Sequence, residues 1–314
     1  MSKSLRLKLL SEFVRRPKQF ARDWANNQQE LAEAREALRL SDMRKASLEL
    51  SLTKSRQARA GNRCQLYDDE RTTDRNEPSE NSFKYDRTRD LKSIYEEQTW
   101  RLQGEHPEEE AMSLAVGGDF EASGRIELAI LQKCGLQADS YLIDVGCGSG
   151  RLAKPLTSYL SGHYSGFDIV ADLVDYAQKI CGRPDWRFGV VDQIEIPEPD
   201  NCADMVCFFS VLTHLLHEQS YWYVEEAVRV AKPGGAIVFS FLDFDERSHW
   251  PVFLNALENL KQSNDTPLDV FMSKEMIKTW STHLSLEIER FVGAEEAIAE
   301  SVALGQSVCM LRKR

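Results

Sequence analysis

The stretch Tyr141-Leu-Ile-Asp-Val-Gly-Cys-Gly-Ser-Gly150 decides the fold of this 314-residue chain. Four of its first five residues are apolar, which is typical of a short strand buried on both faces of a sheet. Gly146, Gly148 and Gly150 then interrupt the run, and because they have no Cβ a ligand can lie directly on their main chain. Residues 151–160 are predicted to continue as a helix. A strand, a glycine loop and a helix in this order predict a nucleotide-binding cradle.

Two common nucleotide-binding loops do not fit this spacing. The dinucleotide fingerprint is Gly-x-Gly-x-x-Gly or Ala, but here the third glycine comes one residue early and Arg151 stands where the small residue belongs. A Walker loop would need Gly-Lys-Ser/Thr, which does not follow. What remains is Asp-x-Gly-x-Gly-x-Gly, with Asp144 two residues ahead of the first glycine. This pattern resembles motif I of the class I S-adenosylmethionine-dependent methyltransferases, and a glycine turn without a ligand is the alternative.

Strand-like and helix-like segments alternate after this loop. Strands are expected at 163–169, 186–191, 203–209, 236–241, 284–292 and 307–311, and helices at 173–180, 221–230, 253–260 and 276–284. Alternation at this spacing predicts an α/β fold with a doubly wound, mostly parallel sheet. The resemblance implies the seven-stranded, Rossmann-like methyltransferase fold, in which the seventh strand lies antiparallel beside the sixth.

The N-terminal third of the chain differs in composition from the rest. Residues 1–60 are predicted to be a basic amphipathic helical extension, residues 61–84 a flexible polar linker, and residues 85–314 the methyltransferase domain with a helical lid at 85–135. A basic amphipathic segment favours contact with an anionic membrane surface or a protein partner, and a helix folded against its own domain fits the pattern equally well.

The distribution of charge and the spacing of the cysteines restrict the classes of partner and the cellular compartment that we expect. Residues 1–63 hold 15 Lys/Arg and 7 Asp/Glu, so the remainder holds 24 and 43 and carries a formal charge of about −19. The negative charge of residues 64–314 repels the phosphate backbone of DNA or RNA, so we expect no nucleic-acid substrate. The seven cysteines are scattered without Cys-x-x-Cys pairing, which predicts reduced thiols and no metal site. The sequence predicts a cytoplasmic protein, peripheral at the inner membrane if the N-terminal segment binds lipid.

The carboxylates at two later strand ends extend the predicted donor site. Asp168 lies 18 residues beyond Gly150, where an open α/β sheet presents a carboxylate to a ribose diol, although a strand-end aspartate also caps helices. By resemblance, Asp192 or the backbone at Gln193 accepts from the adenine amino group. The S-adenosylmethionine contacts that the resemblance implies are at Asp144, Gly146, Cys147, Gly148, Gly150, Asp168, Ile169, Asp192, Gln193 and Ser210.

The segment after the fourth expected strand bears on the acceptor. Residues 209–216 and the Lys-Pro-Gly-Gly at 232–235 are similar to small-molecule methyltransferases, so the resemblance covers roughly residues 115–314. An Asn-Pro-Pro-Tyr type sequence, found where such enzymes methylate exocyclic or amide nitrogens, is absent from 208–211, and this favours an oxygen or another small-molecule nucleophile. His214 is the candidate base, and a histidine that only packs is the alternative.

Four polar residues after the fifth expected strand leave a choice open. Asp243, Asp245, Arg247 and His249 either line the acceptor pocket or form a solvated loop.

These patterns predict an S-adenosylmethionine-dependent methyltransferase that O-methylates a small molecule or a lipid-linked saccharide. A non-catalytic scaffold that retains the fold is the alternative from another class. A nucleotide-dependent oxidoreductase is the alternative enzyme, and Arg151 disfavours it.

Overall fold

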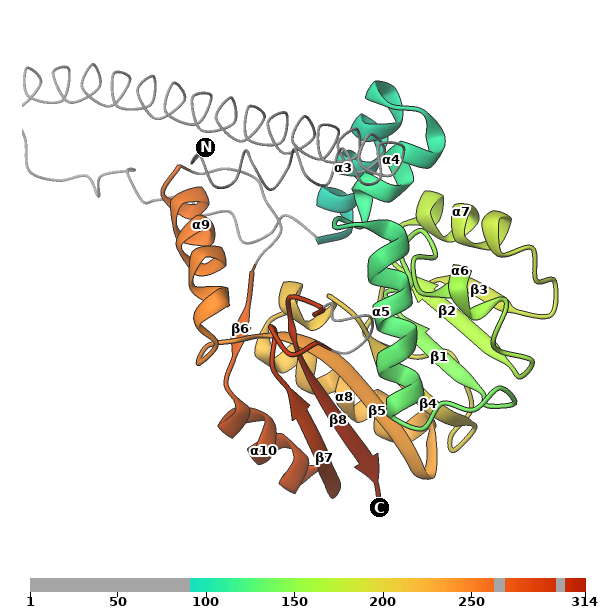
Figure 1. Cartoon of the computed structure of the whole chain (residues 1–314), viewed down its shortest axis with the longest axis vertical. Helices are drawn as coiled ribbons and strands as arrows, with labels where there is room; N and C mark the ends of the chain where they lie inside the picture. The colour runs from blue at the N-terminus through green and yellow to red at the C-terminus, as the bar shows by residue number, and fades with distance from the viewer. Residues whose placement is uncertain (1–90, 263–268, 298–302) are drawn as a thin grey trace, which may run out of the picture. The chain divides into compact units, whose positions relative to one another are not determined.

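The computed structural model describes residues 91–262, 269–297 and 303–314 (Figure 1). The predicted extension at 1–60 and linker at 61–84 lie outside these residues, as does the start of the predicted lid. Phe83–Arg314 form one compact unit. In the described part of the chain, no helix has the length and apolar character needed to cross a membrane.

The centre of this unit is a sheet in the order β3-β2-β1-β4-β5-β8-β7. Its strands are β1 (Leu142–Val145), β2 (Tyr164–Asp168), β3 (Arg187–Val190), β4 (Ala203–Phe208), β5 (Ala231–Asp243), β7 (Leu286–Val292) and β8 (Ser307–Lys313). The strands from β3 to β5 are parallel, whereas β8 is antiparallel to both β5 and β7. An eighth, short strand, β6 (Phe271–Met272), pairs with the end of β5. The predicted doubly wound sheet with a late antiparallel strand is therefore confirmed.

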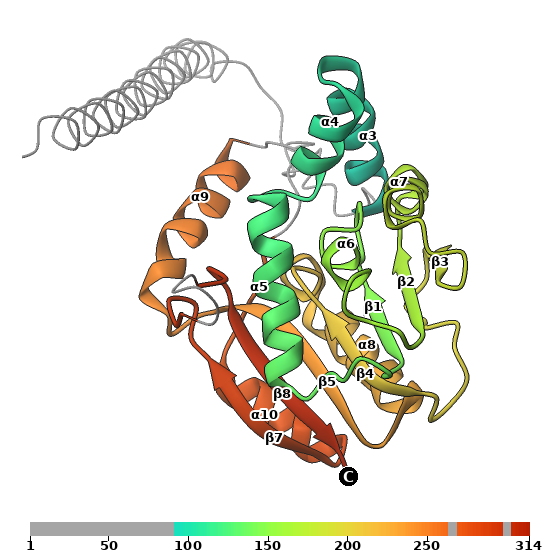
Figure 2. The same ribbon diagram turned by 45° about the vertical axis from the view of Figure 1, so that its right-hand side comes forward.

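Alternating side chains of the strands build two hydrophobic layers. In β1, Leu142 faces the layer beside Tyr164 and Met205, and Ile143 faces the opposite layer beside Val206. The helices α8 (His217–Val230) and α10 (Lys274–His283) cover the layer of Ile143, and α5 (Phe120–Lys133) and α6 (Ala153–Leu156) cover that of Leu142 (Figure 2). Helices on both faces explain why every residue of β1 is buried.

The segment after the glycine loop is less helical than expected. The prediction of a helix over 151–160 was wrong, because only Ala153–Leu156 form an α-helix, α6. Pro155 has no N–H to donate, and the following N–H groups of Thr157, Ser158 and Tyr159 bond to the carbonyl three residues earlier. The chain therefore passes from the loop into a series of tight turns.

Two further helices lie beside the edge at which the parallel strands end (Figure 1). They are α3 (Leu91–Glu105) and α4 (Glu108–Ala115), and both contribute residues to the cavity described below. By contrast, α5, which falls within the predicted lid, is a core helix, since Ile130 and Leu131 are fully buried in the sheet layer. Within the range of the predicted lid, α5 thus belongs to the core and also brings Glu127 to the cavity, and a lid formed by α3 and α4 stays a prediction.

Candidate active site

A cavity opens at the carboxyl ends of β1, β2 and β4. Its volume, including the part open to solvent, is about 1080 Å³. Eight of the residues predicted for the site line it, namely Asp144, Gly146, Cys147, Gly148, Asp168, Ile169, Ser210 and His214. Gly150, Asp192 and Gln193 do not line it. Carboxyl ends of neighbouring parallel strands are where open α/β sheets bind ligands, so the location fits a nucleotide donor.

The glycine loop is tightly packed on its cavity side. An added Cβ at Gly146 would lie 2.2 Å from Cγ2 of Val211, and one at Gly148 would lie 2.6 Å from Cγ1 of Val116. Both glycines also have positive φ angles, 78° and 53°, which L side chains rarely adopt. The main chain of the cradle is therefore closed to any residue larger than glycine, and two valine side chains rest against it.

Gly150 has a different role in this structure. An added Cβ would lie 3.0 Å from Cβ of Ala177 in α7 (Ala171–Cys181), and the φ of Gly150 is 90°. This glycine allows the loop to pack against α7. Its predicted contact with the donor stays a prediction.

Asp168 joins the end of β2 to the glycine loop. Its carboxylate accepts hydrogen bonds from the N–H of Gly148 (2.9 Å) and from the N–H of Val170 (3.0 Å). Burial raises the pKa of Asp168, and these backbone hydrogen bonds oppose the rise. The carboxylate therefore fixes the loop from the next strand and faces the cavity, as a ribose-binding acid must.

The loop after β3 departs from the expected arrangement. Asp192 is exposed and pairs with Lys92 of α3 at 3.3 Å, while the carbonyl of Gln193 accepts from the hydroxyl of Tyr223 at 3.2 Å. Val191 and Glu195 are the residues of this loop that line the cavity. An adenine contact of Asp192 or Gln193 stays a prediction, and Glu195 is a carboxylate there that the sequence did not single out.

Asp144 lies on the face of β1 that α5 covers. It is 2% exposed, and its carboxyl accepts from the hydroxyl of Tyr164 (2.8 Å) and from Sγ of Cys207 (3.6 Å). Burial raises the pKa of Asp144 to about 7, although both hydrogen bonds oppose the rise. This carboxyl therefore titrates near neutral pH beneath the loop.

The raised pKa of Asp144 predicts a pH-dependent free energy of unfolding. A carboxyl with a raised pKa binds protons more readily in the folded state, so its contribution to stability is complete below the unfolded value near 3.8 and is lost as pH rises through 7. The loss amounts to about 4 kcal/mol, since the shift is about three units. We expect Asp144→Asn to abolish this slope in urea unfolding at pH 4, 5.5 and 8.

A control with the opposite sign is available at Asp204. Burial would raise the pKa of Asp204, but the hydrogen bond from Lys232 (2.6 Å) outweighs it, so the pKa is lowered. The contribution of Asp204 to stability is therefore present above the unfolded pKa and is lost as pH falls. Asp204→Asn should therefore destabilise the protein more at pH 8 than at pH 3. If the pH dependence of the free energy of unfolding is the same in Asp144→Asn as in the wild type, the raised pKa of Asp144 is contradicted.

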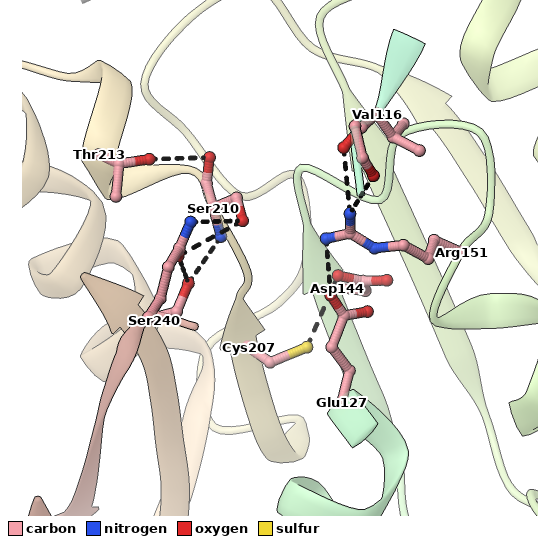
Figure 3. Close-up of polar contacts among 10 residues, drawn as sticks. Val116, Glu127, Asp144, Arg151, Cys207, Ser210, Thr213 and Ser240 are labelled. Carbon is pink, nitrogen blue, oxygen red and sulfur yellow. Dashed lines mark hydrogen bonds and ion pairs between the residues drawn. The ribbon is translucent and has the colours of Figure 1, made fainter. Parts of the chain in front are cut away.

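A buried ion pair forms another wall of the cavity. Nη2 of Arg151 donates to Oε1 of Glu127 at 2.6 Å, and Nη1 donates to the carbonyls of Val116 (3.0 Å) and Gly117 (3.1 Å) (Figure 3). Glu127 is 1% exposed; burial raises its pKa and the charge of Arg151 opposes this. The sequence marked Arg151 only as a departure from the dinucleotide fingerprint and did not single out Glu127. A carboxylate between the apolar residues Ile126 and Leu128 of α5 was the available signal.

Ser210 follows β4 by two residues and has a strained conformation beside the cavity. Its φ is 60°, and its N–H donates to Oγ of Ser240 in β5 at 2.7 Å (Figure 3). Gln306, just before β8, donates from Nε2 to Oγ of Ser210 at 3.1 Å and accepts from Oγ of Ser240 at 2.6 Å. Three strands thus hold this turn, which leads directly into η1 (Leu212–His214).

His214 shares the cavity wall with a phenol and interacts electrostatically with a carboxylate outside the lining. The ring of Tyr95 meets it edge-on with centroids 5.8 Å apart, and both residues line the cavity. The N–H of Val270 donates to the carbonyl of Thr213 at 2.7 Å, which brings Asp269 beside η1. Burial raises the pKa of Asp269, and the charge of His214 opposes the rise. Burial and the charges of Asp168 and Asp269 raise the pKa of Tyr95, so the phenol stays protonated.

The four polar residues at and after the end of β5 divide between the surface and the core: Asp245 and Arg247 are exposed, as a solvated loop would have them, whereas Asp243 and His249 are buried. Asp243 is fully buried and pairs with Lys274 at 3.0 Å. Nδ1 of the buried His249 accepts from the N–H of Asp243 at 2.8 Å, and Nε2 lies 3.2 Å from the carbonyl of Gly305. The expectation of a solvated loop was wrong for these two residues, and none of the four lines the cavity.

Similarity to known proteins agrees with this geometry. A family model described as a methyltransferase domain matches residues 143–239. The tRNA (carboxymethyluridine(34)-5-O)-methyltransferase of Arabidopsis thaliana is 32% identical over 33% of this chain and 24% of its own length. The 27-O-demethylrifamycin SV methyltransferase of Amycolatopsis mediterranei is 30% identical over 37% of this chain and 44% of its own length. The matches thus span only a quarter to under half of these relatives.

A solved structure shares the fold beyond the region matched in sequence. The magnesium protoporphyrin IX methyltransferase of Synechocystis PCC 6803, solved with bound S-adenosylhomocysteine, superposes with a TM-score of 0.51 and covers 71% of this chain and 98% of its own. Its sequence is 15% identical, so it speaks for the fold alone. The family match and this fold confirm the resemblance seen in the sequence: residues 143–239 match a methyltransferase domain, and the described chain has the fold of a solved methyltransferase.

Proposed function

We propose that the protein transfers a methyl group from S-adenosylmethionine to a hydroxyl oxygen of a small-molecule or saccharide acceptor. The observation that carries this proposal is one cavity in which the glycine loop, Asp168 and His214 come together. The names of the two relatives given above refer to a tRNA and to a rifamycin, so they do not choose the acceptor. The absence of nucleic-acid substrates stays an expectation from the acidic charge of residues 64–314.

The residues of the cavity fit the donor. Gly146 and Gly148 line the cavity beside Val211 and Val116, and Asp168 offers carboxylate oxygens to a ribose diol. Arg151 and Glu127 place opposite charges in the same wall, which suits the carboxylate and ammonium of an amino acid. When bound, S-adenosylmethionine supplies an electrophilic methyl group.

On the acceptor side, we assign His214 the role of base. A ring nitrogen would take the proton of the acceptor hydroxyl as the oxygen bonds to the methyl carbon, the carbon–sulfur bond of the donor breaks and S-adenosylhomocysteine leaves. The negative charge of Asp269 stabilises the imidazolium that results, and the protonated phenol of Tyr95 remains a hydrogen-bond donor in the same mouth.

The alternative functions have less support. An oxidoreductase would bind a dinucleotide pyrophosphate at a small residue in place of Arg151, but this side chain is engaged by Glu127 and two carbonyls. A scaffold without catalysis would have no need for a cavity lined by Asp168 and His214. We therefore favour the enzyme.

The experiment that tests the function is methyl transfer from labelled S-adenosylmethionine to the small-molecule fraction of a cell extract. We expect the wild-type protein to label one product, and His214→Ala to reduce its rate by roughly 100-fold to 10,000-fold, as for loss of a general base. S-adenosylhomocysteine affinity should stay within threefold, because His214 does not hold the donor. A full rate in His214→Ala would refute the base, and the absence of any labelled product would refute the small-molecule acceptor.

A narrower form of the proposal concerns a lipid-linked saccharide. The alternation of basic and apolar residues in 1–60 supports a cytoplasmic enzyme held at the inner membrane, where such acceptors lie. These residues fall outside the described part of the chain, so the support comes from the sequence pattern.

A further inference from the structure

The backbone of the turn after β4 is bonded to other side chains, so that one hydroxyl of the turn is left for the cavity. The N–H of Ser210 donates to Oγ of Ser240 in β5 at 2.7 Å, and its carbonyl accepts from Oγ1 of Thr213 at 3.2 Å (Figure 3). Both backbone polar groups of Ser210 therefore have partners within the protein. Its hydroxyl is the polar group that this residue can offer to the cavity, which it lines.

The side-chain amide of Gln306 sets the direction of the hydrogen bond at this hydroxyl. Ser240 is fully buried, and its Oγ accepts from the N–H of Ser210, so its own proton goes to Oε1 of Gln306 at 2.6 Å. Nε2 of Gln306 then faces Ser210 and donates to its Oγ at 3.1 Å. The opposite orientation of the amide would leave the buried proton of Ser240 without this acceptor.

The proton of the Ser210 hydroxyl remains for a ligand. Because its oxygen accepts from Gln306, the hydroxyl acts toward the cavity as a hydrogen-bond donor. Its contact with Oε1 of Gln306 is 3.4 Å long, beyond the usual range for two oxygens, and Oε1 already accepts from Ser240. Ser210 thus favours a ligand atom that only accepts hydrogen bonds.

The turn lies against the glycine loop. Val211, which follows Ser210, packs on Gly146, since an added Cβ at this glycine would lie 2.2 Å from Cγ2 of Val211. Gly146 and Ser210 line the same cavity. The hydroxyl of Ser210 therefore belongs to the part of the cavity that the glycine loop forms, which is the side proposed for the donor.

The charges of the cavity lining restrict how an anionic group can be held there. The carboxylic acids among the lining residues are Glu127, Asp144, Asp168 and Glu195. Arg151 is the one lysine or arginine among the described lining residues, and both of its Nη atoms already donate to protein oxygens. The α-carboxylate of S-adenosylmethionine only accepts hydrogen bonds, so it matches the proton that Ser210 offers.

We propose that Gln306 and Ser240 position the hydroxyl of Ser210 to donate a hydrogen bond to the α-carboxylate of S-adenosylmethionine. The resemblance implies a donor contact at Ser210, and the hydrogen-bond directions name the atom and the ligand group. Gln306 lies outside the cavity lining and is a positioning residue that acts through Ser210. The assignment rests on the proposed function, since it concerns the donor in the same cavity.

The test compares two ligands that differ by the α-carboxylate, S-adenosylmethionine and decarboxylated S-adenosylmethionine, by calorimetry on the full-length protein. Ser210→Gly removes the hydroxyl, and because glycine adopts a φ of 60° without strain, the melting temperature should not fall. We expect this variant to bind S-adenosylmethionine at least tenfold more weakly and the decarboxylated ligand within twofold of the wild type. An equal loss for both ligands, or no loss for either, would overturn the proposal.

A second variant tests the positioning role. Gln306→Met retains the length of the side chain and removes the N–H that Ser210 accepts. It should weaken S-adenosylmethionine binding three- to tenfold in the wild type and leave it unchanged in the Ser210→Gly protein, because Gln306 acts through the hydroxyl. A loss of the same size in both proteins would overturn the role of Gln306.

A matched control and the wild type separate the possible failures. Thr213→Val removes a hydroxyl that is bonded to the same turn but does not line the cavity, so both affinities should stay within twofold. Losses in Thr213→Val equal to those in Ser210→Gly would show that the shape of the turn matters rather than the hydroxyl, and would overturn the proposal. A wild-type protein that binds neither ligand would refute the donor site itself, and this inference with it.

Discussion

Asp168→Ala is expected to weaken S-adenosylhomocysteine binding by roughly 100-fold or more. A ribose diol that donates two hydrogen bonds to a carboxylate gains about 1.5–3 kcal/mol from each, and each 1.4 kcal/mol is a factor of ten in affinity. In the wild type the N–H of Gly148 donates a hydrogen bond to Asp168 at 2.9 Å. The substitution also removes this hydrogen bond, which connects the glycine loop to β2. Isothermal titration of the wild type and the variant measures the change.

Two controls separate the role of Asp168 from a general loss of structure. Asp192→Ala removes an exposed carboxylate that is paired with Lys92 and does not line the cavity, and we expect its affinity to stay within threefold. Asp168→Asn retains the shape and one acceptor oxygen, so its affinity should fall between those of the wild type and Asp168→Ala. NAD should not raise the melting temperature of any of the proteins. Wild-type affinity in Asp168→Ala would show that the donor lies elsewhere.

The sequence could predict the sheet because the information is local. A glycine loop after an apolar run and the repeated alternation of strand and helix need no tertiary contact to be recognised. The helix over 151–160 was predicted wrongly because Pro155 and the turns after it compete with helical bonds in a segment that packs beside α7. Helix length there depends on tertiary context.

The sequence could predict site residues only where they follow neighbouring parallel strands, because the ends of such strands lie side by side. Asp168 follows β2 at a spacing that places it beside the loop of β1, and the structure indeed brings it to Gly148. Glu127 lies 24 residues before Arg151, and only the docking of α5 on the sheet brings the two together. Val116 and Val211 approach the glycines from two different loops, which no spacing rule could show. Contacts between elements that are distant in sequence are set by packing.

Arg151→Met should destabilise the protein by about 3–5 kcal/mol at pH 8. It removes the cation that pairs with Glu127 at 2.6 Å and leaves a carboxylate of 1% exposure uncompensated, which is the costly way to break a buried pair. The substitution also frees the carbonyls of Val116 and Gly117, which Arg151 now holds above the glycine loop. The free energy of unfolding in urea gives the size of the loss.

The pH dependence and a double-mutant cycle identify the cause. Burial raises the pKa of Glu127, and Arg151 opposes the rise through its charge and its hydrogen bond. Without Arg151 the pKa rises further, so the carboxyl takes up a proton more readily as pH falls. The destabilisation by Arg151→Met should therefore be smaller at pH 5 than at pH 8. Adding Glu127→Gln should recover part of the stability, because the amide carries no charge.

An exposed pair on the same helix supplies the reference for this cycle. Arg125 and Glu121 of α5 are 57% and 84% exposed and lie 3.5 Å apart, so Arg125→Met should change stability by less than about 1 kcal/mol at either pH. A loss in Arg151→Met that is equal at pH 5 and pH 8, and additive with Glu127→Gln, would mean that the pair is not what stabilises this wall. If the cycle instead shows coupling, Arg151 and Glu127, which line the cavity, also hold α5 and the segment of Val116 against the glycine loop. The affinity for the donor should then fall together with the stability.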